Sequence, residues 1–211
     1  MTEPKQLISE LLRPQRLSDL TLPQKVIDRL QRMIELGSIM NMVFYGQPGL
    51  GKTTAARIFI NELGPDDSIE INGSTATGVD YVRDHIERFA SSFSMFGGNK
   101  ICFIDEAEFM SKSAQAALRK VIEQTSCNCR YLFAVNDISK LLPAIRSRLL
   151  AICFDIAPSD RAEVQKRLLD RYERKLPELN VQYDRKRLTE IVGIYYPDLR
   201  SIANNIEFEF A

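Results

Sequence analysis

The stretch 46–54 constrains this chain more than any other part of its sequence. It reads Gly-Gln-Pro-Gly-Leu-Gly-Lys-Thr-Thr and fits the pattern G-x-x-x-x-G-K-[ST]. An apolar run at Met42–Tyr45 precedes it, and a helical pattern at Thr53–Leu63 follows it. Glycines let the backbone curl so that several N–H groups point at one phosphate, and the helix N-terminus adds positive partial charge. The order of strand, loop and helix predicts a nucleotide phosphate site, and the alternative is a tight turn that happens to use glycines.

Two side chains of this loop carry specific chemistry. Lys52 is placed to reach the β- and γ-phosphates of a nucleotide, and the Thr53 hydroxyl is placed to bind Mg²⁺. The predicted nucleotide-binding residues of the loop are Gly46, Gln47, Pro48, Gly49, Leu50, Gly51, Lys52, Thr53 and Thr54.

Short apolar runs alternate with amphipathic helical stretches over the first three quarters of the chain. The five runs are Met42–Tyr45, Ser68–Ile71, Ile101–Ile104, Tyr131–Val135 and Ala151–Phe154. Nearly continuous hydrophobicity is typical of strands that are buried on both faces. We therefore expect an α/β fold, a parallel sheet with helices on both sides.

The pattern changes after residue 156. Three helical stretches, Ser159–Lys175, Asp184–Ile194 and Pro197–Phe208, follow with no strand between them. We expect Pro158 and Pro197 to open the first and last helices, and Pro177 to break the chain after the first. The predicted division is residues 1–156 as the nucleotide-binding α/β domain and residues 157–211 as a small helical subdomain.

Two carboxylates, Asp105 and Glu106, end the apolar run Ile101–Ile104. Ligands bind at the carboxyl ends of strands in open α/β sheets, so Asp105 is expected to face a Mg²⁺ beside the phosphate loop. A carboxylate directly after it suits a base that orients an attacking water, which favours an ATP-hydrolysing motor or switch. A solvated acidic turn is the alternative.

Two further residues stay ambiguous from position alone. Asn136 ends the run Tyr131–Val135, where it would touch the water or the γ-phosphate if that strand lies between the other two; an Asx turn with Asp137 explains it equally well. Arg148 follows a short helical turn, and nothing in the subunit obviously needs it. It is a candidate for an arginine that acts on the ATP of a neighbouring subunit, or else an ordinary surface arginine.

The charge balance bears on possible partners. The 28 Lys and Arg residues equal the 28 Asp and Glu residues, which argues against chain-wide attraction to nucleic acid and leaves room for a local basic face. The sequence carries neither an N-terminal secretory signal nor an apolar run of the ~20 residues that cross a bilayer. We expect a cytoplasmic protein (host cytoplasm for a phage protein, nucleus for a eukaryotic one) without a membrane partner.

Taken together, the motifs resemble the AAA+ clamp-loader ATPases, namely the small subunits of replication factor C and their tailed-phage equivalents. The resemblance covers residues 7–206. It rests on Leu11-Leu12-Arg13-Pro14 with Leu17–Leu20, on Gly46–Thr54 as Walker A, on Asp105–Glu108 as Walker B, on Ser113–Arg119, on Ser147-Arg148 and on Pro197–Arg200. It implies an AAA+ P-loop fold, with a parallel five-stranded sheet and a helical lid, that binds ATP and Mg²⁺.

The resemblance also implies residue roles. Arg13 and Pro14 would wall the adenine pocket, Asn136 would take the sensor-1 position, and Arg200 would contact ATP from the lid. Glu106 and Lys52 would serve hydrolysis together with Arg148 of a neighbouring subunit. Thr53 and Asp105 would hold the metal.

Its implied partners are other clamp-loader subunits in a hetero- or homo-oligomeric ring, a sliding clamp and primer–template DNA. Gly78 and Arg83 resemble the start of the helix that follows the DNA backbone, and Arg119 and Lys120 lie on a second helix expected to face the channel. A solvated helix face is the alternative for each basic residue.

Three departures from the family pattern stand out. Leu149 replaces a cysteine after Ser147-Arg148, and Pro197 replaces a frequent glycine. The sequence also stops just after the sensor-2 helix, so we expect it to lack the helical collar domain; a fragment, a truncated product and a two-domain relative all fit. The alternatives to a clamp loader are an ATP-binding scaffold with little activity, a branch-migration or helicase-loader motor, and an unfoldase whose pore loop is Met95-Phe96-Gly97.

Overall fold

The chain forms one parallel five-stranded sheet. The computed structural model describes residues 7–37, 39–63, 67–92, 94 and 100–210. The strands are β1 (Met42–Tyr45), β2 (Ser68–Asn72), β3 (Lys100–Asp105), β4 (Cys129–Val135) and β5 (Leu150–Cys153), in the order β2-β3-β4-β1-β5. Every pairing is parallel. The predicted α/β class and all five strands are confirmed.

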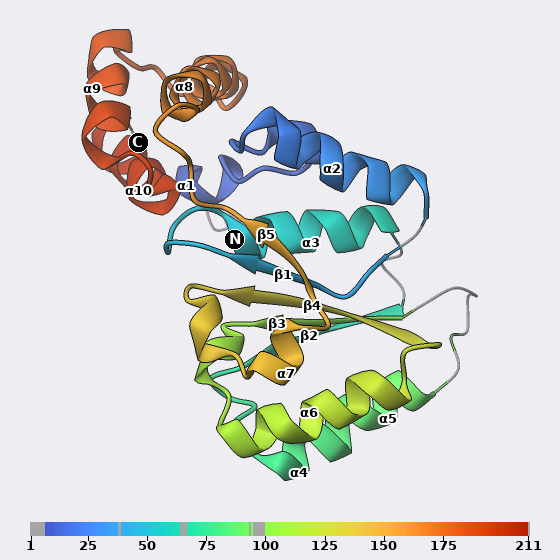
Figure 1. The fold of residues 1–211 in the computed structure, drawn as a ribbon. Helices are drawn as coiled ribbons and strands as arrows, with labels where there is room; N and C mark the ends of the chain where they lie inside the picture. The colour runs from blue at the N-terminus through green and yellow to red at the C-terminus, as the bar shows by residue number, and fades with distance from the viewer. Residues whose placement is uncertain (1–6, 38, 64–66, 93, 95–99, 211) are drawn as a thin grey trace, which may run out of the picture.

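Helices cover both faces of the sheet, as Figure 1 shows. On one face, α2 (Gln24–Glu35) and α3 (Lys52–Leu63) pack against inward side chains such as Phe44 and Phe103. On the other face, α6 (Lys112–Gln124) packs against Val43 and Phe133, beside a helical stretch made of α4 (Val79–Tyr81), the π-helix η3 (Val82–Glu87) and α5 (Arg88–Ser91). Adjacent strand residues thus enter different cores, which explains why the strands are apolar on both faces.

The connections at the carboxyl ends of the strands are short. A single turn of helix, η4 (Ala107–Phe109), follows β3; η5 (Ile138–Lys140) and α7 (Pro143–Arg146) follow β4. Because β4 lies between β3 and β1, the ends of three strands bring Asp105, Asn136 and the phosphate loop to one edge. The sequence placed Asn136 near the γ-phosphate only if its strand lies between the other two, and the strand order meets this condition.

Three helices, α8 (Arg161–Glu178), α9 (Arg185–Tyr195) and α10 (Leu199–Phe210), follow the sheet. The expected break at Pro177 is wrong, because α8 continues through this residue to Glu178. Proline leaves the carbonyl four residues earlier without its helical donor. Here the Tyr183 hydroxyl donates to that carbonyl, of Glu173, at 3.3 Å.

The other two prolines precede their helices rather than opening them. A turn separates Pro158 from the start of α8, and α10 begins after Asp198. The Asp198 carboxylate accepts hydrogen bonds from the backbone N–H groups of Arg200 and Ser201 at 3.0 and 3.1 Å. This aspartate therefore caps α10, a role that aspartate fills well.

The N-terminal helix α1 (Ile8–Leu11) packs with the C-terminal helices. Ile8 and Leu12 lie in the same apolar cluster as Leu168, Ile191 and Ile206. The division into residues 1–156 and 157–211 remains a proposal. The packing of α1 groups this helix with residues 157–211, although it lies in the first range.

Two further sequence predictions concern a membrane span and a pore loop. Within the described part of the chain, no helix is long and apolar enough to cross a membrane. The possible pore loop Met95-Phe96-Gly97 lies outside the described residues.

Candidate functional site

A cavity of about 360 Å³ lies where the phosphate loop, the strand ends, the N-terminal segment and the C-terminal helices meet. It brings together most of the predicted site. Its lining includes Arg13, Pro14, Pro48, Gly49, Leu50, Gly51, Lys52, Thr53, Thr54, Asp105, Glu106, Asn136 and Arg200. Gly46 and Gln47 do not line the cavity, but their carbonyl oxygens accept hydrogen bonds from Lys52.

The phosphate loop needs glycine at two positions for steric reasons. Gly46 has φ +141°, and a Cβ there would lie 2.9 Å from an oxygen of Asp155. Gly49 has φ +82°, and a Cβ there would lie 2.2 Å from an oxygen of Asp198. Asp155 also accepts the N–H of Gln47 at 2.8 Å, so it holds the loop from outside. Sequence reasoning missed Asp155, and it quoted Asp198 within the motif Pro197–Arg200 without giving it a role.

The Lys52 side chain joins the loop to the end of β4. Its Nζ donates to the carbonyl oxygens of Gly46 and Gln47, both at 2.8 Å, and to Oδ1 of Asn136 at 2.9 Å. Burial lowers the pKa of Lys52, while the nearby carboxylates of Glu108 and Asp105 oppose that shift. The acceptors of the ammonium group are all uncharged oxygens. A charged phosphate oxygen is a stronger acceptor and can replace them.

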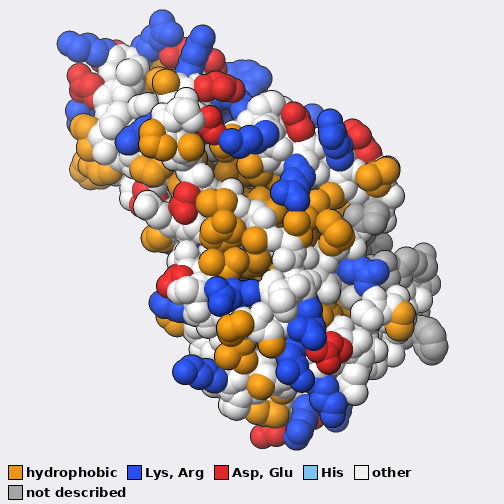
Figure 2. Space-filling view, viewed as in Figure 1, with side chains coloured by type: hydrophobic (Ala, Val, Ile, Leu, Met, Phe, Trp, Pro, Cys, Tyr) orange, Lys and Arg blue, Asp and Glu red, His pale blue; other side chains and the backbone are white. Residues whose placement is uncertain are grey.

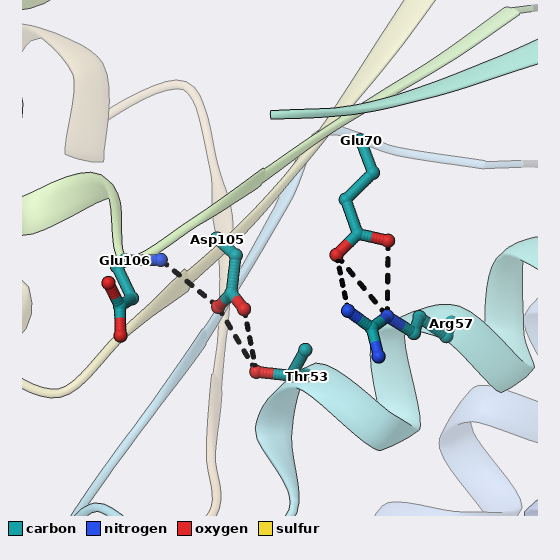
Figure 3. Close-up of polar contacts among 5 residues, drawn as sticks. All are labelled: Thr53, Arg57, Glu70, Asp105 and Glu106. Atoms are coloured by element: carbon teal, nitrogen blue, oxygen red, sulfur yellow. Dashed lines mark hydrogen bonds and ion pairs between the residues drawn. The ribbon is translucent and has the colours of Figure 1, made fainter. Parts of the chain in front are cut away.

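Thr53, in the first turn of α3, faces Asp105 at the end of β3 (Figure 3). The Thr53 hydroxyl lies 2.9 and 3.1 Å from the two Asp105 carboxylate oxygens, and the N–H of Glu106 donates to one of them at 3.0 Å. Burial raises the pKa of Asp105. One carboxylate and one hydroxyl are hard oxygen donors that suit Mg²⁺, which usually keeps waters and binds substrate phosphates as well. No group of three or more His, Cys, Asp or Glu side chains suited to a metal exists among the described residues.

Glu106 has an unusual backbone. Its φ is +52°, in the left-handed region, and its side chain is exposed. Gly73 packs directly beneath it, since a Cβ on Gly73 would lie 2.5 Å from the Glu106 carbonyl oxygen. A non-glycine residue held in this region costs of order 1 kcal/mol and is often found at functional sites. The close packing of Gly73 fixes the direction in which the Glu106 side chain leaves the strand.

Asn136 takes part in a polar chain rather than a turn. Its backbone N–H and its side-chain amide donate to Oε1 of Glu108 at 2.9 and 2.8 Å, and this leaves its Oδ1 for Lys52. The Asx turn at this point belongs to Asp137, which accepts the N–H of Ser139 at 2.8 Å. Glu108 is only 8% exposed, and its Oε2 has no hydrogen-bond partner among the described residues. Sequence reasoning quoted Glu108 within its motif and gave it no role.

Arg57, one turn after Thr53, also lines the cavity. Its guanidinium binds both carboxylate oxygens of Glu70 at 2.7–3.2 Å, and this hydrogen bonding raises the pKa of Arg57 (Figure 3). The pair, which is neutral overall, lies beside the Thr53–Asp105 site (Figure 3). No motif in the sequence pointed to it.

The start of α10 rests on the phosphate loop. The N–H of Leu199 donates to the Gly49 carbonyl oxygen at 3.1 Å. Arg200 follows directly and lines the cavity with an exposed side chain. The structure therefore brings the predicted lid arginine to the site.

Arg148 lies outside the cavity lining and is held by its own subunit. Its guanidinium forms an ion pair with Glu123 of α6, and its Nη1 donates to the Ala144 carbonyl oxygen at 2.6 Å. The sequence showed no obvious need for Arg148 within the subunit, and the structure gives it these two partners there. Residue spacing gave no sign that the end of α6 would reach α7.

The candidate DNA contacts lie on the helices over the other face of the sheet. Gly78 precedes α4 in open space, since a Cβ at this residue would meet nothing within 4 Å, and Arg83 is exposed on the π-helix. Arg119 is exposed on α6 with Nε 3.7 Å from Glu123, and Lys120 beside it is also exposed. Figure 2 shows Lys and Arg side chains over this lower half of the molecule, with few acidic ones between them.

Comparison with known proteins agrees with these features. A family model described as "ATPase family associated with various cellular activities (AAA)" matches residues 42–154. Replication factor C subunit 4 of Saccharomyces cerevisiae is 33% identical over 94% of this chain and 61% of its own length. The replication factor C small subunit of Sulfurisphaera tokodaii is 33% identical over 95% and 61%, and the probable replication factor C subunit 5 of Dictyostelium discoideum is 31% identical over 94% and 57%.

The chain therefore spans about three fifths of the length of these relatives. Among solved structures, the RuvB Holliday junction branch migration motor of Thermotoga maritima superposes with a TM-score of 0.73 at 19% identity, over 94% of this chain and 64% of the other. At that identity the likeness concerns the fold alone.

Proposed function

This chain belongs to the AAA family of ATPases, and from that premise we propose that it is an ATPase subunit of a sliding-clamp loader. Its similarity to replication factor C subunits runs through both the sheet and the C-terminal helices, at 31–33% identity. The observation that carries the proposal is the cavity, where the phosphate loop, Asp105–Glu106, Asn136 and Arg200 meet.

ATP binds in this cavity with its phosphates on the loop and its base toward Arg13 and Pro14. Lys52 exchanges its carbonyl and Asn136 contacts for phosphate oxygens, which are stronger acceptors for an ammonium group. The Thr53 hydroxyl and the Asp105 carboxylate would hold Mg²⁺, which would supply neutralisation of the phosphate charge.

Hydrolysis is assigned to Glu106 as the base that orients water. The exposed carboxylate follows Asp105 directly, so it lies beside the metal site and is free to approach a water. Asn136 donates its amide Nδ2 to Glu108 and accepts from Lys52 through its Oδ1, which would place this side chain beside the γ-phosphate that Lys52 binds. Arg200 on the helix that rests on Gly49 contacts the same phosphate from the lid.

Arg148 acts on a neighbouring subunit. It lies outside the cavity of its own chain, and an arginine supplied in trans stabilises the charge that develops on the transferred phosphoryl group. The ring partners are other clamp-loader subunits, and the ring grips primer–template DNA through Gly78, Arg83 and Arg119. ATP binding then opens the clamp, and hydrolysis releases it on DNA.

The test is ATP hydrolysis by a ring assembled from this chain, its partner subunits, a sliding clamp and primer–template DNA. We expect turnover that rises with both clamp and DNA, and a loss of at least about 100-fold in Glu106→Gln with ATP binding retained. A rate that ignores both additions would reject the clamp loader. A Glu106→Gln ring that still loads clamps and a wild-type ring without turnover would support an ATP-binding scaffold instead.

A further inference from the structure

The N-terminal segment is anchored to two different apolar cores. Ile8 and Leu12 pack among the C-terminal helices, whereas Leu17 and Leu20 pack with α2 and α3 against the sheet. Residues 13–16, here called the connecting segment, join the two anchors. Arg13 and Pro14 of this segment line the cavity. Its position therefore depends on what holds α1 in place.

Glu207 of α10 caps the start of α1. Its carboxylate accepts the N–H of Ile8 at 3.2 Å, and the N–H and hydroxyl of Ser9 at 3.0 and 2.5 Å. A carboxylate at a helix N-terminus pairs with otherwise unsatisfied N–H groups and with the helix dipole. A helix of 4 residues has little stability of its own, so contacts of this kind hold it.

Arg171 of α8 holds the other end of α1. Its side chain is 5% exposed, its Nη2 donates to the Leu12 carbonyl oxygen, and it lines the cavity together with its neighbour Tyr172. Its Nε has no hydrogen-bond partner among the described residues. Burying a guanidinium is costly, and here the bond to Leu12 directly precedes the connecting segment.

We propose that Glu207 and Arg171 are positioning residues for recognition of the nucleotide base. They fix α1 to the C-terminal helices, and α1 in turn sets the wall that Arg13 and Pro14 present to the base. The inference rests on the proposed function in one respect, that the cavity is the ATP site. The phosphate loop is held by the sheet, by Asp155 and by Leu199 at the start of α10, and none of these contacts passes through α1. Loss of either anchor therefore weakens binding of the base and spares binding of the phosphates.

The experiment compares two probes on the full chain, Mg·ATP and Mg·tripolyphosphate, by titration calorimetry. Tripolyphosphate has the phosphates and no base. We expect Glu207→Ala and Arg171→Met each to raise the Kd for ATP about tenfold, with the Kd for tripolyphosphate within about twofold of wild type. Glu207→Gln keeps an acceptor oxygen and should recover part of the ATP affinity.

Glu209→Ala is the matched control. Glu209 is on the same helix, and its carboxylate pairs with Arg187 at 3.0 Å, away from α1. It should leave both affinities unchanged. Thermal unfolding of each variant shows whether it is folded, and Arg171→Met tests the inference from another helix if Glu207→Ala unfolds.

The outcomes separate the inference from the proposed function. A wild-type chain that binds no ATP would overturn the nucleotide site, and the inference with it. A wild-type chain that binds ATP, with anchor variants that lose both probes equally or lose neither, would overturn the inference alone.

Discussion

The two ends of the cavity are built in different ways. At the phosphate end, the loop itself consists of residues close in sequence, since Lys52 bonds to carbonyl groups 5 and 6 positions away, and neighbouring strand ends bring Asp105 and Asn136 to it. At the base end, contacts join residues at opposite ends of the chain, with 198 positions between Ser9 and Glu207 and 159 between Leu12 and Arg171. The phosphate end is therefore a local loop motif completed by neighbouring strands of the sheet, whereas the base end exists only when the N-terminal segment and the C-terminal helices have docked.

The largest effect expected is at the phosphate end, from Lys52→Ala. This change removes the buried ammonium group and its three hydrogen bonds, and ATP affinity should fall by roughly 100-fold. Binding of tripolyphosphate should fall in parallel, in contrast to the base-end variants. Lys25→Ala is the control, because Lys25 pairs with Asp160 at the surface and does not line the cavity. Normal tripolyphosphate binding by Lys52→Ala would contradict the division into two ends.

The next change tests the contact between the phosphate loop and the start of α10, which lies between the phosphate end and the base end of the cavity. In Gly49→Ala, the new methyl group would meet Asp198 at 2.2 Å with φ at +82°. We expect the free energy of unfolding to fall by about 2–3 kcal/mol in chemical denaturation. Gly193→Ala, in α9 with nothing within 4 Å, should raise it by about 0.5–1 kcal/mol. Equal effects from the two alanines would show that the loop does not press on Asp198.

The contrast between the ends also explains what the sequence revealed. Lys52 and Thr53 belong to a loop motif that follows one apolar strand, and Asp105 ends another, so pattern and spacing were enough to predict the edge at which they meet. Asn136 stayed ambiguous in the sequence, and its place at this edge depends on β4 lying between β3 and β1. Arg13 and Pro14 came from family resemblance, because nothing near them in sequence indicates a cavity.

The remaining features depend on contacts between distant elements. Glu108 acquires its role only when η4 meets the end of β4, and Arg148 acquires its partner only when α6 and α7 pack. The wrong prediction at Pro177 has the same origin, since Tyr183, beyond the helix, supplies the missing donor. Local rules therefore predict elements and motifs, while docking between elements decides the partners of individual side chains.

A smaller effect concerns the charge that the phosphate end carries before nucleotide binds. Burial raises the pKa of Asp105 above its usual 3.8, so this carboxyl favours folding at low pH and loses that contribution as pH rises through its folded-state pKa. Asp105→Asn should therefore raise the melting temperature of the nucleotide-free chain by about 2 °C at pH 7. The gain should shrink as the pH is lowered from 7 to 4, because the wild-type carboxyl takes up its proton at a higher pH in the folded chain than in the unfolded one. Destabilisation at both pH values would mean that the hydrogen bond from Thr53 outweighs the cost of burying the charge.

The smallest effect on the isolated chain is expected outside both ends, at Arg148. Its pair with Glu123 is exposed, with 37% and 40% of the two side chains accessible, and exposed pairs contribute about 0–1 kcal/mol. Arg148→Ala should change the free energy of unfolding by less than about 1 kcal/mol and leave the Kd for ATP unchanged in calorimetry. In a ring, the same change should lower hydrolysis at the neighbouring site, and Arg148→Lys should not restore it because lysine lacks the planar fork. Weaker ATP binding by the isolated Arg148→Ala chain would instead place this arginine in its own subunit's site, and the trans role would fail.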